Sequence, residues 1–166
     1  MLLALGKSLY LASTFEKKCQ YVLRLFDFGD MLHESDDVRT VFARAAARKD
    51  RLLGPTLERM SQHPLADSAD IAILVMAKDA RNYIAHEAGE IGLMQAAEVA
   101  ESLAMLRRQV IKLAQGDNVI SVWMFEIQEK KHAPKWMTQT YEARVLNWVF
   151  GDPFEEPDRG ALHWYI

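Results

Sequence analysis

Hydrophobic residues along this chain recur at intervals of three and four positions, which is the spacing that places side chains on one side of an α-helix. No segment shows the strict alternation of apolar and polar residues expected of a half-buried strand. The first apolar stripe predicts one long helix that ends near Gly29 or His33. Its members are Leu5, Leu9, Ala12, Cys19, Val22, Leu23 and Phe26.

Capping and helix-breaking residues divide the next part of the chain into shorter helices. Ser35 is followed by two acidic residues, a pattern typical of a helix N-terminus. This second helix is expected to end near Leu53, because the Gly54-Pro55 pair after it disfavours helix. A short helix is then expected from Thr56 to just before Pro64.

Residues from about 69 to 88 carry the pattern of one continuous helix. Asp67 or Ser68 can cap its N-terminus, and Gly89 or Gly92 can end it. Its core face is predicted from apolar residues at helical spacing, which are Ile73, Met76, Ala77, Ala80 and Ile84.

Two further helical patterns complete the chain. The stripe Val99, Leu103, Leu106, Val110 and Leu113 predicts one helix, which residues 116–118 are expected to kink or interrupt. An apolar run follows from Val119 to Phe125, and Pro134 ends that segment. Met137, Tyr141, Val145 and Trp148 line a last helix that closes at Gly151. The whole pattern predicts an all-α protein, a single-domain bundle of about five helices over residues 1–166.

The C-terminal tail, residues 153–166, departs from this pattern. It mixes acidic residues with an aromatic end, His163-Trp164-Tyr165-Ile166. Because a large apolar patch seldom stays in water, we expect the tail to dock on the bundle or on a second subunit. Packing is the favoured role for it.

Composition narrows the functional classes. The chain has 166 residues, half of them hydrophobic, which suits one packed core. A net charge of −3 argues against a protein that coats nucleic acid by bulk electrostatics, although a local basic track remains compatible with it. The single cysteine, Cys19, excludes an intrachain disulfide and is expected to be a buried small hydrophobe. Without a secretory leader pattern or an apolar run of about 18 residues, a cytoplasmic protein with no membrane contact is expected.

The candidate chemistry lies in the helix predicted for residues 69–88. Asn82 and His86 are four residues apart and therefore share a helix face, and the long side chain of Arg81 can reach toward them. An imidazole that titrates near neutral pH beside a permanently charged planar cation suits chemistry on a phosphate group.

The Arg-Asn-x3-His spacing, in a helical chain of this length, resembles the signature of the HEPN superfamily. The resemblance implies a metal-independent endoribonuclease with Arg81, Asn82 and His86 as its catalytic residues. The 2′-OH of RNA would attack the adjacent phosphate, with histidine as acid or base and arginine stabilising the charge. Each chain supplies one such histidine, so the resemblance also implies a homodimer in which two motifs face each other. A toxin or defence effector held in check by an antitoxin or another small regulatory protein is the biological role expected from it.

One feature of the toxin branch of that superfamily is absent here. In those proteins a tyrosine two residues after the histidine is modified by a partner nucleotidyltransferase, whereas this chain has Ala88 at that position. Control of this protein by the same modification is therefore not expected.

A non-catalytic HEPN-like module that binds RNA, a nucleotide or a protein partner is the alternative interpretation. Arg44, Arg48 and Arg51 lie on one face of the second predicted helix, which suits either an RNA-binding track or an ordinary solvated face. The tryptophans Trp123, Trp136 and Trp148 could stack on bases, but packing in the core is favoured for each. His63, next to Pro64, is interpreted as a loop residue.

A metal site is the third and weakest interpretation. Glu129/His132 and Asp30/His33 have the three-residue spacing found in di-iron bundles, and His86/Glu90 has a four-residue spacing. None of these pairs is accompanied by the further ligands that such a site needs. No metal ion or other cofactor is therefore predicted.

Overall fold

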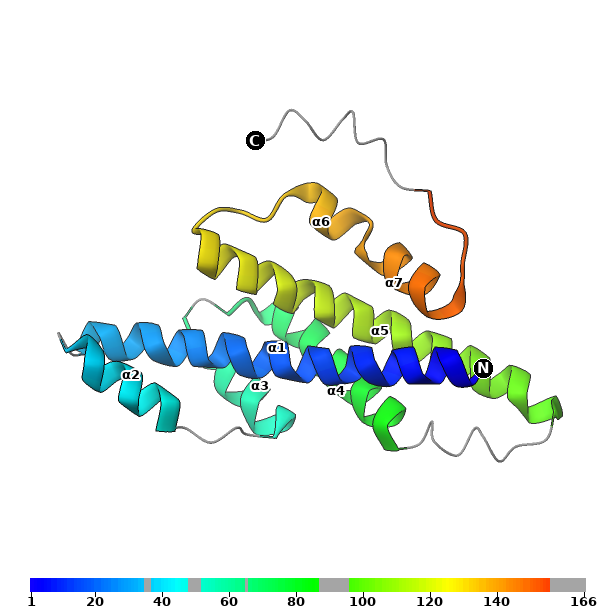
Figure 1. The fold of residues 1–166 in the computed structure, drawn as a ribbon, viewed down its shortest axis with the longest axis horizontal. Coiled ribbons are helices and arrows are strands. Elements are labelled where there is room, and N and C mark those ends of the chain that lie inside the picture. Colours follow the sequence, from blue (N-terminus) through cyan, green and yellow to red (C-terminus); the bar gives the residue numbers. More distant parts are fainter. Residues whose placement is uncertain (35–36, 48–51, 65, 87–95, 156–166) are drawn as a thin grey trace.

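The computed structural model describes residues 1–34, 37–47, 52–64, 66–86 and 96–155, and within these ranges it contains helices and no strand (Figure 1). The helices are α1 (Leu2–Glu34), α2 (Val38–Ala47), α3 (Leu53–Ser61), α4 (Ser68–His86), α5 (Ala96–Glu129), α6 (Lys135–Gln139) and α7 (Tyr141–Phe150). The prediction of an all-α bundle is confirmed. In the part of the chain so described, no helix has both the length and the apolarity needed to cross a membrane.

The two long helices, α1 and α5, organise the bundle (Figure 1). Helix α4 packs against both of them, and α6 and α7 lie on another side of α5. Helices α2 and α3 pack against α1, and α3 also contacts α4. Buried side chains from α1, α3, α4, α5 and α7 form one hydrophobic cluster, so these helices share a core.

Cys19 lies inside this core, fully buried as predicted. Burial raises the pKa of its thiol far above the usual value, and the nearby carboxylates of Asp117 and Glu16 act in the same direction. The thiolate is the reactive form of cysteine, and the raised pKa disfavours it. Cys19 therefore serves as a packing residue of the core.

Three helix boundaries differ from those predicted. Helix α3 begins at Leu53 and contains Gly54 and Pro55 in its first turn, where a proline is tolerated because its missing N–H would have no partner there. Helix α5 continues through residues 116–118 without interruption. The predicted last helix is divided at Thr140 into α6 and α7, and α7 ends at Phe150, where it is capped by Gly151 in a left-handed conformation (φ 78°).

Gly116 marks the closest approach of two helices. A Cβ atom added at Gly116 would lie 2.2 Å from the Cβ of Ala77 on α4, far closer than two carbon atoms can approach. The glycine that was expected to kink α5 therefore serves packing. It lets the backbones of α4 and α5 meet at Ala77.

Helix α4 is one continuous helix, as predicted, and Asp67 caps it by accepting a hydrogen bond from the backbone N–H of Ala69 at 2.7 Å. Its buried residues are Leu74, Ala77, Ala80 and Ile84. The assignment of Met76 to the core face was wrong, because this side chain is 45% exposed. Leu74 is buried in its place, since α4 is enclosed by α1, α3 and α5 and its core face is rotated accordingly.

A buried carboxylate joins α1, α5 and α7. Asp117 accepts a hydrogen bond from the Lys18 ammonium at 2.7 Å and another from the Tyr141 hydroxyl, and Lys18 also donates to Ser121. Burial raises the pKa of Tyr141, and the adjacent negative charge of Asp117 adds to this effect. Tyr141 therefore remains a protonated donor and fastens α7 to α5.

The three tryptophans do not share one environment. Trp123 is buried, as predicted, and its indole N–H donates to Asp70 at 2.7 Å in the first turn of α4. Trp136 and Trp148 are partly exposed, so their assignment to the core was wrong. Trp148 packs edge-on against Tyr10 and carries the Lys7 ammonium over its ring, which places it on the surface between α7 and α1.

The contact at Gly116 generates a stability prediction. Replacing Gly116 with alanine should lower the free energy of unfolding by about 1–3 kcal/mol, because α4 and α5 must separate to admit the methyl group. The matched control is Gly6→Ala, at a helical glycine where an added Cβ meets nothing within 4 Å. Urea unfolding should show the control equal to or more stable than the wild type. Equal stability of Gly116→Ala and wild type would contradict the close packing.

Candidate functional site

The predicted catalytic residues lie in the last two turns of α4. Asn82 and His86 are both exposed, and His86 is the final residue of the helix. Arg81 is only partly exposed, because it is turned toward α1. The helix therefore presents the amide and the imidazole to solvent and the guanidinium to the neighbouring helix.

Arg81 is held by two partners. One guanidinium nitrogen pairs with the Glu16 carboxylate of α1, and another donates to the Asn82 side-chain oxygen at 3.2 Å. The side chains of Arg81 and Glu16 are 23% and 20% exposed, which makes this a half-buried ion pair. Arg81 thus links α4 to α1, and its ion pair with Glu16 contributes to the stability of the fold.

One face of α4 combines the motif with apolar residues. Val75, Asp79, Asn82 and His86 follow the spacing of a helix face and are all exposed. Val75 is 39% exposed, and its neighbour Met76 is exposed to a similar degree. We call this surface the α4 face; Val75 lies on it about three turns from His86, and Met76 lies at its edge, about 100° further round the helix.

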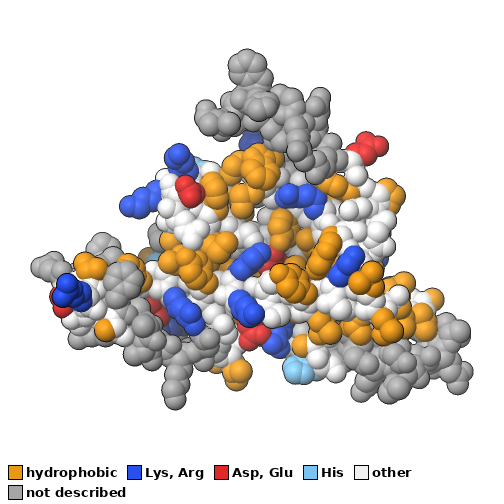
Figure 2. Space-filling model, viewed as in Figure 1, with side chains coloured by type: hydrophobic (Ala, Val, Ile, Leu, Met, Phe, Trp, Pro, Cys, Tyr) orange, Lys and Arg blue, Asp and Glu red, His pale blue; other side chains and the backbone are white. Residues whose placement is uncertain are grey.

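The side chains of the predicted RNA-binding track, Arg44, Arg48 and Arg51, lie outside the described part of the structure. The backbone of Arg44 belongs to α2, whereas Arg48 and Arg51 lie outside the described ranges entirely. Figure 2 shows the Lys and Arg side chains on one side of the molecule scattered among hydrophobic ones.

Only one of the residue pairs considered for metal binding, Glu129 and His132, lies wholly within the described residues. His132 is fully exposed and lies 3.3 Å from a carboxylate oxygen of Glu126, which is not the glutamate that its spacing suggested. Glu90 and the side chain of His33 lie outside the described residues. Across the described ranges, no three His, Cys, Asp or Glu residues form a group suited to a metal ion.

Other features named from the sequence also fall outside the described ranges. They are Ser35, Ala88, Gly89, Gly92 and residues 156–166 of the C-terminal tail. The preceding segment is anchored, because Arg107 of α5 forms two hydrogen bonds with the Asp152 carboxylate, one of them 2.9 Å long. This pair lowers the pKa of Asp152.

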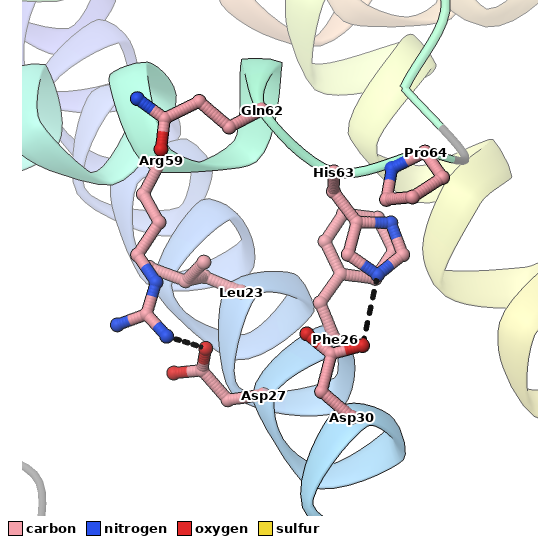
Figure 3. A pocket seen from close by; sticks show the side chains of 8 residues that line it. All are labelled: Leu23, Phe26, Asp27, Asp30, Arg59, Gln62, His63 and Pro64. Carbon is pink, nitrogen blue, oxygen red and sulfur yellow. Dashed lines mark hydrogen bonds and ion pairs between the residues drawn. The ribbon is translucent and has the colours of Figure 1, made fainter. Parts of the chain in front are cut away.

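A pocket that sequence reasoning missed lies between α1 and the end of α3 (Figure 3). Its volume is about 190 Å³, and we call it the His63 pocket. Its lining residues are Leu23, Phe26, Asp27, Asp30, Arg59, Gln62, His63 and Pro64. The interpretation of His63 as a plain loop residue was incomplete, because its ring is largely buried and forms one wall of this pocket.

Two acid–base pairs flank the His63 pocket on opposite sides (Figure 3). Arg59 pairs with the buried carboxylate of Asp27 on one side, and His63 faces Asp30 at 3.7 Å on the other. The His63 ring is stacked on Phe26, with ring centres 3.8 Å apart and planes inclined by 3°. The sequence offered only a weak signal for this site, the three-residue spacing of Asp27 and Asp30 on α1.

No known protein-family model matches the chain, and neither a curated protein nor a solved structure matches it. The resemblance to HEPN domains therefore rests on Arg81, Asn82 and His86 and on their helical setting.

The ion pair between Arg81 and Glu16 generates a second stability prediction. Glu16→Gln should lower the free energy of unfolding by about 1 kcal/mol, because it removes the charge partner of a half-buried guanidinium. Asp79→Asn is the matched control, since Asp79 pairs with Lys78 at 3.3 Å on the exposed side of the same helix. A double-mutant cycle should give a clear coupling energy for Arg81 and Glu16 and almost none for Lys78 and Asp79. Equal coupling in both pairs would show that Arg81 does not tie the helices together.

Proposed function

We propose that this protein is a metal-independent endoribonuclease whose active site forms when two copies of the α4 face meet. The observation that carries this proposal is the joint exposure of Asn82 and His86 on a helix face that also exposes Val75, with Met76 exposed at its edge. Polar groups suited to phosphate chemistry thus lie beside apolar surface of the kind that a second subunit covers.

Each residue has a defined role in this proposal. His86 of one copy removes the proton from the 2′-OH as that oxygen attacks the adjacent phosphorus. His86 of the other copy donates a proton to the departing 5′-oxygen, which leaves a 2′,3′-cyclic phosphate and a 5′-OH. Arg81 stabilises the negative charge on the non-bridging phosphate oxygens, and Asn82 orients the imidazole or the phosphate.

The need for two copies follows from the two proton transfers that the reaction requires. The reaction requires a base and an acid at the same time, and each motif holds one histidine. A two-fold axis through the α4 face would place equivalent residues opposite each other, because such interfaces are self-complementary. The same contact would cover Val75 and Met76.

Glu16 gives Arg81 a fixed starting position. In the free protein the carboxylate neutralises part of the guanidinium charge and orients the side chain between α1 and α4. An arginine retains donors after one such contact, because its guanidinium carries five N–H groups. The remaining donors can serve a phosphate bound at the α4 face.

A biological role as a toxin or defence effector acting on cytoplasmic RNA fits this chemistry, with an antitoxin or another small protein as its regulator. Since Ala88 stands where a modifiable tyrosine would be, we infer that such a partner acts by covering the α4 face.

The pairing of Arg81 with Glu16 favours one alternative, a module that binds RNA, a nucleotide or a protein without cutting RNA. In that case Arg81 serves packing, and the exposed His86 supplies only a contact. Loss of His86 would then weaken binding slightly and have no catalytic consequence.

The central prediction concerns His86. Purified wild-type protein should cleave labelled RNA in the presence of EDTA, leave an all-deoxy strand intact, and show a bell-shaped dependence of rate on pH. His86→Ala should reduce the cleavage rate by about 100-fold or more, the usual effect of losing a proton-transfer group. His132→Ala, which removes a fully exposed histidine elsewhere, should cleave as the wild type does.

Three results would contradict this mechanism. Cleavage of the deoxy strand would exclude the 2′-OH as nucleophile. Recovery of activity only after addition of a divalent metal would move the assignment to metal-dependent hydrolysis. Binding of RNA by wild-type protein without any cleavage would support the binding module.

The dimer is tested by a charge placed on the α4 face. Met76→Glu should leave the fold intact, because this side chain is half exposed, and should abolish both self-association and cleavage. Leu52→Glu, at another exposed apolar residue just before α3, is the matched control and should preserve both. Light scattering and the cleavage assay measure the two effects. A Met76→Glu protein with wild-type mass and activity would exclude this interface.

A further inference from the structure

The His63 pocket has the size and the donor–acceptor arrangement of a site for a single flat heterocycle. Its volume of about 190 Å³ is below the roughly 300–1,000 Å³ of sites that enclose a whole drug-sized ligand. Phe26 and the His63 ring stacked on it supply a flat apolar wall, and Leu23 lies between the two acid–base pairs (Figure 3). A whole nucleotide is too large for this space, whereas one base fits it.

The charges of the pocket favour a ligand that presents N–H donors. Asp27 and Asp30 are two carboxylates, whereas Arg59 is the one permanent cation in the lining. Asp27 is buried and satisfied by Arg59, so it serves mainly to hold that side chain. Asp30 is 61% exposed and presents its carboxylate at the rim. The one permanent cation, Arg59, is already paired with Asp27, so a free phosphate is disfavoured here.

We propose that the His63 pocket binds a guanine base, with Asp30 as acceptor and Arg59 as donor. Guanine is the base that offers two adjacent N–H donors, at N1 and N2, and these match the two oxygens of one carboxylate. It also offers two adjacent acceptors, O6 and N7, which arginine recognises through its forked guanidinium. Cytosine offers a carboxylate only its amino group, and uracil flanks its one N–H with acceptors.

The position of the pocket links this inference to RNA cleavage, and in that respect it rests on the proposed function. Asp27 follows Glu16 by eleven positions on α1, which corresponds to three helical turns and about 16 Å. Glu16 contacts Arg81, so the His63 pocket lies on the same side of α1 as the motif arginine. A single RNA strand could therefore place its scissile phosphate near Arg81 and a guanine a few nucleotides away in the pocket.

Binding is tested first with nucleosides, which carry no phosphate. Guanosine added to the wild-type protein should shift the ring NMR signals of His63 and Phe26. Inosine, which lacks the amino group at C2, should bind about tenfold or more weakly because one charge-assisted hydrogen bond is lost. Cytidine, uridine and adenosine should leave the ring signals unchanged at the same concentrations.

The variant that tests recognition is Asp30→Asn, which keeps the shape of the side chain but replaces one acceptor by a donor. It should weaken guanosine binding at least about tenfold while leaving stability unchanged, because Asp30 is mostly exposed. Glu101→Gln, at an exposed carboxylate of α5, is the matched control and should bind as the wild type does. Equal affinity for guanosine and inosine, unchanged binding by Asp30→Asn, or no shift at millimolar guanosine would each overturn the proposal.

The source of the guanine is decided with short RNAs that contain a single guanine at different positions. Cleavage at a constant distance from the guanine in the wild type, lost in Asp30→Asn, would identify the ligand as a base of the RNA substrate. Guanosine binding combined with cleavage that ignores the guanine would identify a free nucleoside or nucleotide instead. If no RNA is cut, the proposed function fails, and the nucleoside titration still decides the pocket on its own.

Discussion

The contact between Gly116 and Ala77 is the constraint on which the rest of this structure depends. It brings α4 and α5 together at a distance that any larger side chain would prevent. The rotation of α4 about its axis follows from this contact, because Ala77, Ala80 and Ile84 must all face the core. Asn82 and His86 then point to solvent, and Arg81 points to Glu16 on α1. The chemistry proposed for α4 is therefore set by packing on the opposite side of the helix.

The same helix links two polar sites. Near its start, Asp70 accepts the indole N–H of Trp123, and that ring lies against Phe26 at the His63 pocket. Near its end, Arg81 pairs with Glu16. Each site combines a carboxylate of α1 with a basic residue from another helix, namely Asp27 with Arg59 and Glu16 with Arg81. Helix α1 thus supplies the anchoring carboxylates for both.

Local patterns in the sequence were sufficient to predict the all-α class, the continuity of α4 and its cap at Asp67. These features depend on residues that are close together in the chain. They failed for Met76, since periodicity alone could not show that α4 is enclosed by three helices and turned toward Leu74. They also missed the His63 pocket, because the His63 ring stacks on Phe26, which lies 37 positions away in the sequence. Gly116 was read as a break because a glycine that serves close packing looks the same in a sequence as one that bends a helix.

The central claim, that the active site is built from two copies of the chain, is tested most directly by diluting the enzyme. The initial rate of RNA cleavage would be measured in EDTA over a series of protein concentrations that spans the range of dimer dissociation. A composite site predicts that the rate per mole of protein falls on dilution, and that below the dissociation constant the total rate varies with the square of the concentration. A rate per mole that stays constant down to fully monomeric protein, or an absence of cleavage at every concentration, would contradict it.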